Sequence, residues 1–215
     1  MELWTVVLSL FNEAITLLSA NFSGDQAIAI IVFTLIFKLI LMPLQLKSSL
    51  KLQTNKSAIA KLKPQLERLK AKHVGDPKAL FLHSSKLYKK HDISFVDQAS
   101  IMNLASQGVF GFAMFQTIQA LKLSAPFLWI TNLAKPDVYL ALIVGFLTYL
   151  ATILTPGMAE QSNQMIVLLP AVLSVIAVAV FPSALGLYWA TSNIVTIFQS
   201  YIVKGLLKKQ SYSFQ

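Results

Sequence analysis

Lys38 lies near the middle of an otherwise apolar stretch, Ala27–Leu46, that is long enough to cross a bilayer. A cation at that depth carries an apparent insertion cost of about 2.5–3.5 kcal/mol, so it requires a water-filled cavity or a polar partner inside a helix bundle. The interiors of the apolar stretches offer no acidic partner, because Asp97 and Glu160 lie near their expected cytoplasmic boundary. We therefore expect Lys38 to face a hydrophilic recess that attracts anionic groups.

Polar side chains recur at helical spacing in the later apolar stretches. Residues three or four positions apart share one face of a helix, and polar faces in a bilayer turn toward the bundle interior. We expect the recess around Lys38 to be lined by Ser100, Asn103, Gln107, Thr148, Thr152, Gln164, Trp189, Ser192, Asn193, Thr196 and Gln199. The alternative for any one polar residue is that it only joins helices by a hydrogen bond worth about 0.6–2 kcal/mol.

Motifs for catalysis, cofactors and metals are absent from the sequence. The chain has no cysteine, so disulfides and thiolate metal sites are excluded. It also lacks a GxxxxGK[ST] phosphate loop, an HExxH zinc motif and a GxSxG nucleophile elbow. The three histidines, His73, His83 and His91, lie in a basic segment where solvated histidines are far commoner than a metal site. We expect a protein that is not an enzyme and that has no cofactor or metal.

Composition indicates an all-α integral membrane protein. The 215 residues are 55% hydrophobic and 13% charged, whereas a soluble domain has about 25% charged residues. Five transmembrane helices are predicted, and prolines punctuate the connections between them. These helices cover residues 27–46, 95–121, 138–154, 164–180 and 184–207. The N-terminus lacks a basic region and a small-residue cleavage site, so we expect no removable signal peptide.

Residues 1–22 have polar and apolar side chains on opposite helical faces. This pattern predicts an amphipathic helix lying in the membrane interface. The alternative is a short additional span, since a crossing helix needs about 20 residues.

Residues 47–92 predict a basic helical hairpin that turns at His73–Asp76. Asp76 and Pro77 form a good helix start, and Pro64 would kink the first arm or mark its beginning. The lysines and arginine expected to recruit a partner are Lys61, Lys63, Arg68, Lys70, Lys72, Lys86, Lys89 and Lys90. Dense positive charge beside a membrane attracts anionic lipid, although a merely solvated hairpin is the alternative.

The distribution of basic residues predicts the orientation of the chain. Of 18 lysines and arginines, 12 lie between Lys47 and Lys90, and three more occur from Lys204 onward. Cytoplasmic segments are enriched in such residues. We expect a multi-pass protein of the bacterial cytoplasmic (inner) membrane, or of an organellar membrane, with its N-terminus outside. The hairpin and a short tail, residues 208–215, would be inside. Because the charge is concentrated beside the spans, we expect no recognition of specific nucleic-acid sequences.

Several segments resemble one known family. FPSALGLYWATSN, Phe181–Asn193, is similar to the FPAGLxLYWxxSN segment of the YidC/Oxa/Alb membrane protein insertases, and FLWITNLAKPDVY, Phe127–Tyr139, is similar to their FLWxxDLxxPDPYY segment. KLKPQLERLKAKH, DPKAL and LYKKH in the hairpin resemble further family pieces. The family has arginine where Lys38 stands and paired glutamines where Ala151 and Thr152 stand. Its Gly- and Pro-bearing turn into the second span is replaced by His91–Gln107.

The resemblance implies an ATP-independent insertase of small membrane proteins. Its groove, centred on Lys38, would be open to the cytoplasm and to lipid and closed to the outside. The implied partners are newly made membrane proteins and anionic lipids, with a ribosome or the Sec translocon as further candidates, and the protein would act as a monomer or with one partner subunit. Two alternatives remain: a non-inserting assembly chaperone or accessory subunit of a membrane complex, and a small anion transporter. The transporter is disfavoured because we detect no internal repeats.

Overall fold

The structure, a computed structural model, describes residues 2–91, 93, 98–121, 123–155 and 164–212. Within these ranges the side chains of residues 52–57, 98–100, 103, 104, 164, 166 and 209–212 are not described. The described residues form helices and no β-strand. The helices are α1 (Glu2–Asn21), α2 (Gln26–Lys72), α3 (Pro77–Lys90), α4 (Gln98–Leu121), α5 (Val138–Leu154), α6 (Gln164–Val180) and α7 (Ser183–Tyr212).

The observed helix bounds follow the expected spans closely except in α2. Helices α5 and α6 begin and end at the expected residues, and α7 extends five residues beyond the expected end at Leu207. The span expected at Ala27–Leu46 is only the first part of α2, which continues without a break to Lys72 and accommodates both Pro43 and Pro64. Residues 95–97, the start expected for the second span, lie outside the described residues.

Several helices are suited to a bilayer. By length and composition, Glu2–Asn21 and Gln26–Lys51 could each cross a membrane, and α5 and Val167–Val180 are shorter apolar helices. Helix α6 packs mainly against α5 and exposes large apolar side chains over the rest of its surface. Exposed apolar surface of this extent is uncommon in soluble monomers. The all-helical fold with these apolar helices fits a membrane protein.

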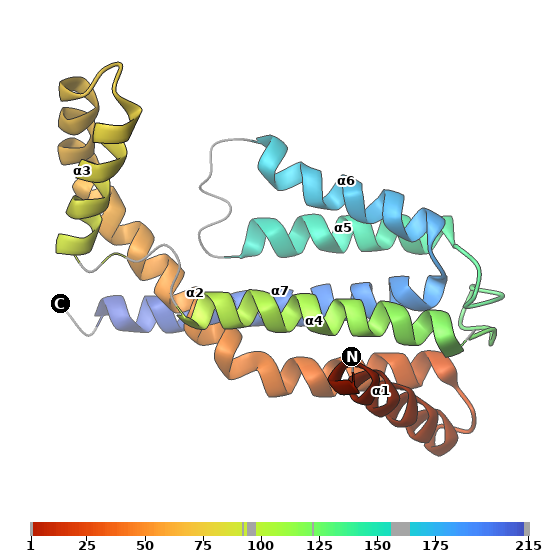
Figure 1. The fold of residues 1–215 in the computed structure, drawn as a ribbon. Coiled ribbons are helices and arrows are strands. Elements are labelled where there is room, and N and C mark those ends of the chain that lie inside the picture. Colours follow the sequence, from red (N-terminus) through yellow and green to blue (C-terminus); the bar gives the residue numbers. More distant parts are fainter. Residues whose placement is uncertain (1, 92, 94–97, 122, 156–163, 213–215) are drawn as a thin grey trace.

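The long helices form a bundle whose two ends differ (Figure 1). Helix α7 contacts α2, α4 and α5, while α6 packs on α5 and α1 packs on α2 and α4. One end of the bundle holds the connections around residues 22–25, 123–137 and 181–182. The other end carries the α2–α3 hairpin and the C-terminal end of α7. We call these the loop end and the hairpin end.

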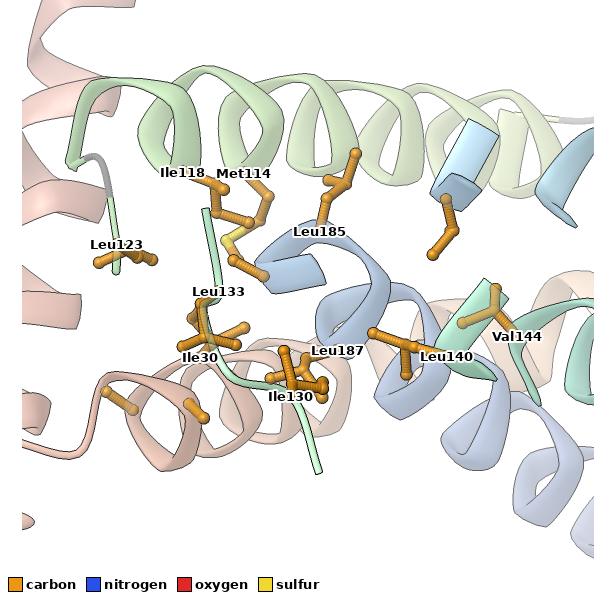
Figure 2. Close-up of a cluster of buried hydrophobic side chains, with 14 of the residues drawn as sticks. Ile30, Met114, Ile118, Leu123, Ile130, Leu133, Leu140, Val144, Leu185 and Leu187 are labelled. Carbon is orange, nitrogen blue, oxygen red and sulfur yellow. The ribbon is translucent and has the colours of Figure 1, made fainter. Parts of the chain in front are cut away.

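The loop end is packed with apolar side chains. Figure 2 shows Leu123, Ile130 and Leu133, from the segment between α4 and α5, gathered with residues of α2, α4, α5 and α7. The same segment is tied to the start of α7, because Ser183 donates from its backbone N to the Lys135 carbonyl at 2.9 Å and Ala184 donates to the Leu133 carbonyl at 3.1 Å. A separate cavity of about 330 Å³ also lies at this end, lined by Ile118, Gln119, Leu123, Leu133, Ala134 and Pro182.

Helix α1 is attached to the bundle by aromatic contacts. The Phe11 ring lies 5.0 Å from Phe33 and 5.5 Å from Phe110, measured between ring centroids. Trp4 donates a hydrogen bond of 2.8 Å from Nε1 to Oε1 of Gln116. The apolar face expected from the sequence therefore packs on α2 and α4. A second set of apolar side chains is exposed on α1, namely Leu3, Val6, Leu10 and Leu17.

The α2–α3 hairpin projects from the hairpin end of the bundle because α2 continues beyond the helices against which its first part packs. The turn after α2 contains Gly75 at φ +84°, a backbone conformation that glycine adopts without strain. Asp76 then caps α3 by accepting a 3.0 Å hydrogen bond from the Ala79 N–H. The rings of His73 and His83 stack across the two arms, with centroids 4.6 Å apart.

Candidate functional site

A cavity of about 780 Å³ lies between four helices and contains Lys38 in its wall. Only 3% of the Lys38 side chain is exposed. The cavity wall is formed by α2, α4, α5 and α7, which contribute Lys38, Ser48, Ser49, Gln107, Gly111, Phe115, Thr148, Ala151, Thr152, Thr155, Leu185, Tyr188, Trp189, Ser192, Asn193 and Thr196. Ten of these sixteen side chains carry hydroxyl or amide groups.

Lys38 has no acidic neighbour in this wall. The described residues that line the cavity include no aspartate or glutamate, and no hydrogen bond or ion pair joins the Lys38 side chain to another described residue. An ammonium group held at such depth needs polar surroundings or water. The cavity beside it, with its hydroxyl and amide walls, provides space for both.

Most residues expected to line a recess border this cavity. Lys38 and seven others, Gln107, Thr148, Thr152, Trp189, Ser192, Asn193 and Thr196, are in its wall. Gln199 instead lines a smaller cavity described below. Ser100, Asn103 and Gln164 lie on α4 and α6, but their side chains are outside the described ones.

Several of the hydroxyl groups are bonded to their own helices. Thr148, Thr152 and Thr196 each donate to the carbonyl oxygen four residues earlier, at 2.7, 2.8 and 2.9 Å. Such bonds satisfy the hydroxyl hydrogen and leave the oxygen lone pairs available. One lone pair of Thr148 is used in this way, because Asn193 Nδ2 donates a hydrogen bond to Thr148 Oγ1 at 2.8 Å. This bond joins α7 to α5, so for these two residues the helix-joining alternative also holds.

A second cavity of about 230 Å³ adjoins the first, and it is lined by residues that lie farther along α2 and α7, toward the hairpin end. Its lining residues are Gln45, Leu46, Ser49, Gln107, Thr155, Thr196, Gln199, Ser200 and Val203. Four of these residues, Ser49, Gln107, Thr155 and Thr196, also line the first cavity. The two cavities therefore adjoin, and we call them together the groove, which extends from beside Leu185 toward the hairpin end.

One side of the groove is not closed by helix packing. Helices α4 and α5 both contribute to its wall, yet the described residues of these helices make no contact with each other. Helix α6 does not close the gap, since it contacts α5 and α7 but not α4.

The groove contains residues that the sequence interpretation missed. Ser48 and Ser49 were missed because the span was expected to end at Leu46, whereas Gln45 lies inside that span and was not singled out among its residues. A signal was available, since Gln45 and Ser49 follow Lys38 by seven and eleven residues and so share its helical face. Tyr188 was missed because its aromatic ring suits an apolar core. It edges against Phe110, with ring centroids 5.6 Å apart.

The residues expected to recruit a partner are all exposed on the hairpin. Lys61, Lys63, Arg68, Lys70 and Lys72 lie on α2, and Lys86, Lys89 and Lys90 lie on α3. Phe81 and Leu82 of α3 are also exposed. The hairpin therefore presents both positive charge and apolar side chains. Among the side chains that the structure describes, no group of three His, Cys, Asp or Glu is arranged to hold a metal ion.

Comparison with known sequences identifies relatives of this chain. The sequence model of the family described as 60Kd inner membrane protein matches residues 18–210. The membrane protein insertase YidC of Helicobacter pylori is 32% identical over 196 residues, which cover 88% of this chain and 35% of that protein. YidC of Clostridium tetani is 28% identical over 94% of this chain and 92% of its own length. YidC of Fusobacterium nucleatum is 31% identical over 85% and 88%.

The relatives fall into two lengths. The chain spans about a third of the Helicobacter and Geobacter proteins that it matches, but about nine tenths of the Clostridium and Fusobacterium proteins. The match to the family model extends over the helices that form the groove and over the hairpin. The chain belongs to the 60Kd inner membrane protein family, the YidC/Oxa family of membrane protein insertases.

Proposed function

We propose that this protein inserts small membrane proteins into the bacterial inner membrane through the groove centred on Lys38, without ATP. The observation that carries the proposal is the position of Lys38, which is buried beside a polar cavity and has no acidic partner there. The family membership supports the reaction, since the relatives are membrane protein insertases by name.

In this proposal α2, α4, α5, α6 and α7 are the five transmembrane helices. Helix α1 is embedded at the outer interface and the α2–α3 hairpin is in the cytoplasm. The apolar packing at the loop end closes the groove to the outside. The groove then opens to the cytoplasm at the hairpin end and to lipid between α4 and α5. The N-terminus is outside and the C-terminus inside, as the distribution of basic residues predicts.

The groove lowers the barrier to moving a polar segment across the bilayer. Each unsatisfied backbone group in dry hydrocarbon costs several kcal/mol. A polar segment that enters the groove meets hydroxyl and amide groups instead, and an acidic segment is attracted by the ammonium of Lys38. Meanwhile the apolar helix of the client passes into lipid through the gap between α4 and α5. Burial of that helix in the bilayer drives the reaction.

The hairpin recruits partners in this proposal. Its eight exposed basic residues attract anionic lipid headgroups, at about 1 kcal/mol for each Lys or Arg near the surface. The exposed Phe81 and Leu82 add apolar contact. The partners are newly made membrane proteins and anionic lipids, with a ribosome or the Sec translocon as further candidates. The protein acts as a monomer or with one partner subunit.

Substitution of Lys38 tests the proposal. We expect Lys38→Ala to reduce insertion of a small single-span client with an acidic tail by roughly tenfold or more, because hydrogen bonds to a charged group contribute about 1.5–3 kcal/mol. Lys38→Arg should retain most activity because it keeps the charge. The measurement is protease protection of the client in liposomes that contain only this protein. Lys135→Ala is the matched control, since Lys135 is exposed at the loop end.

Full activity of Lys38→Ala would remove the charge from the mechanism. If wild-type protein inserts nothing but captures one partner stably, it is an assembly chaperone or accessory subunit. If it conducts anions across the liposome membrane in a Lys38-dependent way, it is a transporter.

A further inference from the structure

Two buried glutamines in the second cavity have amide groups without a partner. Gln45 of α2 is 6% exposed and Gln199 of α7 is 7% exposed. The Nε2 atom of each is covered by protein and has no hydrogen-bond acceptor among the described residues. Both side chains line the same cavity of about 230 Å³. A buried donor without an acceptor is destabilising, so two of them beside one cavity indicate that an acceptor binds there.

The remaining polar groups of this cavity complement the glutamines. Thr155, Thr196 and Ser200 donate their hydroxyl hydrogens to carbonyl oxygens of their own helices, at 2.7, 2.9 and 2.9 Å. Their oxygen atoms can therefore accept hydrogen bonds from a ligand. The lining residues include no charged side chain. The cavity thus presents neutral donors on α2 and α7 and neutral acceptors on α7 and at the end of α5.

A peptide group matches this arrangement better than an ion does. It carries one N–H donor and one carbonyl acceptor and has no net charge. An anion would find no cation in this wall, and a cation would find no carboxylate. The terminal torsion of a glutamine side chain is broad, so either amide can turn its Nε2 into the cavity when an acceptor enters.

We propose that the second cavity binds the main chain of the client segment that crosses the membrane, with the Gln45 and Gln199 amides donating to its carbonyl oxygens. This inference rests on the proposed insertase function and specifies what the groove recognises. A non-helical segment within the bilayer must satisfy its peptide groups. Lys38 attracts acidic side chains of the client. The two glutamines can bind a client of any sequence, because they donate hydrogen bonds to carbonyl oxygens, which every residue has.

The test replaces one peptide bond of the client by an ester. An ester has no N–H, and its carbonyl oxygen is a weaker acceptor than that of an amide. Two synthetic single-span clients, identical except for one amide-to-ester replacement in the polar segment, are inserted into liposomes that contain the full chain. With wild-type protein we expect the ester client to insert roughly three- to tenfold more slowly, the size expected for one or two neutral hydrogen bonds.

Substitution of both glutamines assigns this difference to the cavity. In Gln45→Leu/Gln199→Leu both clients should insert slowly and at the same rate, so that the ester-to-amide ratio approaches one. The matched control is Gln119→Leu, at the loop end, which should leave the ratio unchanged. Because the readout is a ratio, a uniform loss of active protein does not alter it. If the leucine variant does not fold, methionine at both positions gives the same comparison with flexible side chains that lack donors.

The outcomes separate the two proposals. If wild-type protein inserts the amide client no better than protein-free liposomes do, the insertase function itself is wrong. If wild-type protein inserts both clients equally fast, or if the ester effect persists in the double variant, main-chain binding by this cavity is wrong and the cavity holds only water.

Discussion

Asn193 and Thr148 are two polar residues of the groove that are bonded to each other. The 2.8 Å hydrogen bond between them joins α7 to α5 at buried positions. Thr148 Oγ1 accepts this bond while donating to the Val144 carbonyl, so the hydroxyl is used in both directions. The bond holds two walls of the groove at a fixed separation.

A double-mutant cycle measures this bond. We expect Asn193→Leu and Thr148→Val each to lower the free energy of unfolding. The double variant should lose less than the sum of the two single losses, by about 0.6 kcal/mol, the average found for hydrogen bonds between transmembrane helices, and by at most about 1.7 kcal/mol. The measurement is reversible unfolding in detergent micelles. Additive losses would show that the bond does not form.

Residue spacing predicted much of the groove lining, and its failures have physical causes. Ser192, Asn193 and Thr196 were predicted because polar residues on one face of an apolar helix turn away from lipid and toward the interior of the bundle. Spacing could not show that Asn193 reaches Thr148, since helix contacts depend on packing angles. Ser49 was missed because the expected end of the span was set by hydropathy, whereas the helix continues beyond the apolar region. Gln45 lies inside the expected span, and no polar residue at helical spacing within that span drew attention to it.

At the scale of elements, Gly145 lies where α5 packs closely on α6. A Cβ atom at Gly145 would overlap the side chain of Val175, which would have to move to make room for it. Small residues allow such close approach between transmembrane helices. Gly108 of α4 is the opposite case, because no atom lies within 4 Å of a Cβ built there.

These two glycines form a matched pair of alanine substitutions. We expect Gly145→Ala to lower the free energy of unfolding by about 1–3 kcal/mol, as overpacking does. Gly108→Ala should leave it unchanged or raise it by about 0.5–1 kcal/mol, because alanine favours the helix. Thermal unfolding in detergent gives both values. Equal effects of the two substitutions would contradict the close approach of α5 and α6.

Local sequence signals were sufficient to predict some helix ends but not others. Helix α5 begins where Asp137 accepts a 2.7 Å hydrogen bond from the Leu140 N–H, and a capping aspartate beside a proline is visible in the sequence. In α2, Pro64 suggested a kink or the beginning of a helix, whereas the helix runs through both Pro43 and Pro64 to Lys72. Tertiary contacts outweigh the local preference there, because α2 packs on α1, α4, α7 and α3.

At the scale of the whole molecule, the loop end and the hairpin end should lie on opposite sides of the membrane. The absence of cysteine makes this testable with single-cysteine variants. We expect a membrane-impermeant maleimide to label Ser124→Cys in intact cells whose outer membrane is permeable to it. Lys78→Cys should be labelled only after the inner membrane is disrupted. Both positions are exposed, so a difference in labelling reports the side of the membrane. Labelling of both in intact cells would contradict the orientation.

Pro43 lies in α2 between Lys38 and Gln45 and has no N–H to donate to the Leu39 carbonyl. The helix therefore lacks one backbone hydrogen bond between Lys38 and Gln45, with the apolar cluster anchoring it on one side and the hairpin extending it on the other. A force applied to the hairpin by a docking partner would bend α2 at this point. Gln45 would then shift while Lys38 stays in place. A partner that docks on the hairpin would in this way widen or narrow the groove at the hairpin end without moving the Lys38 ammonium.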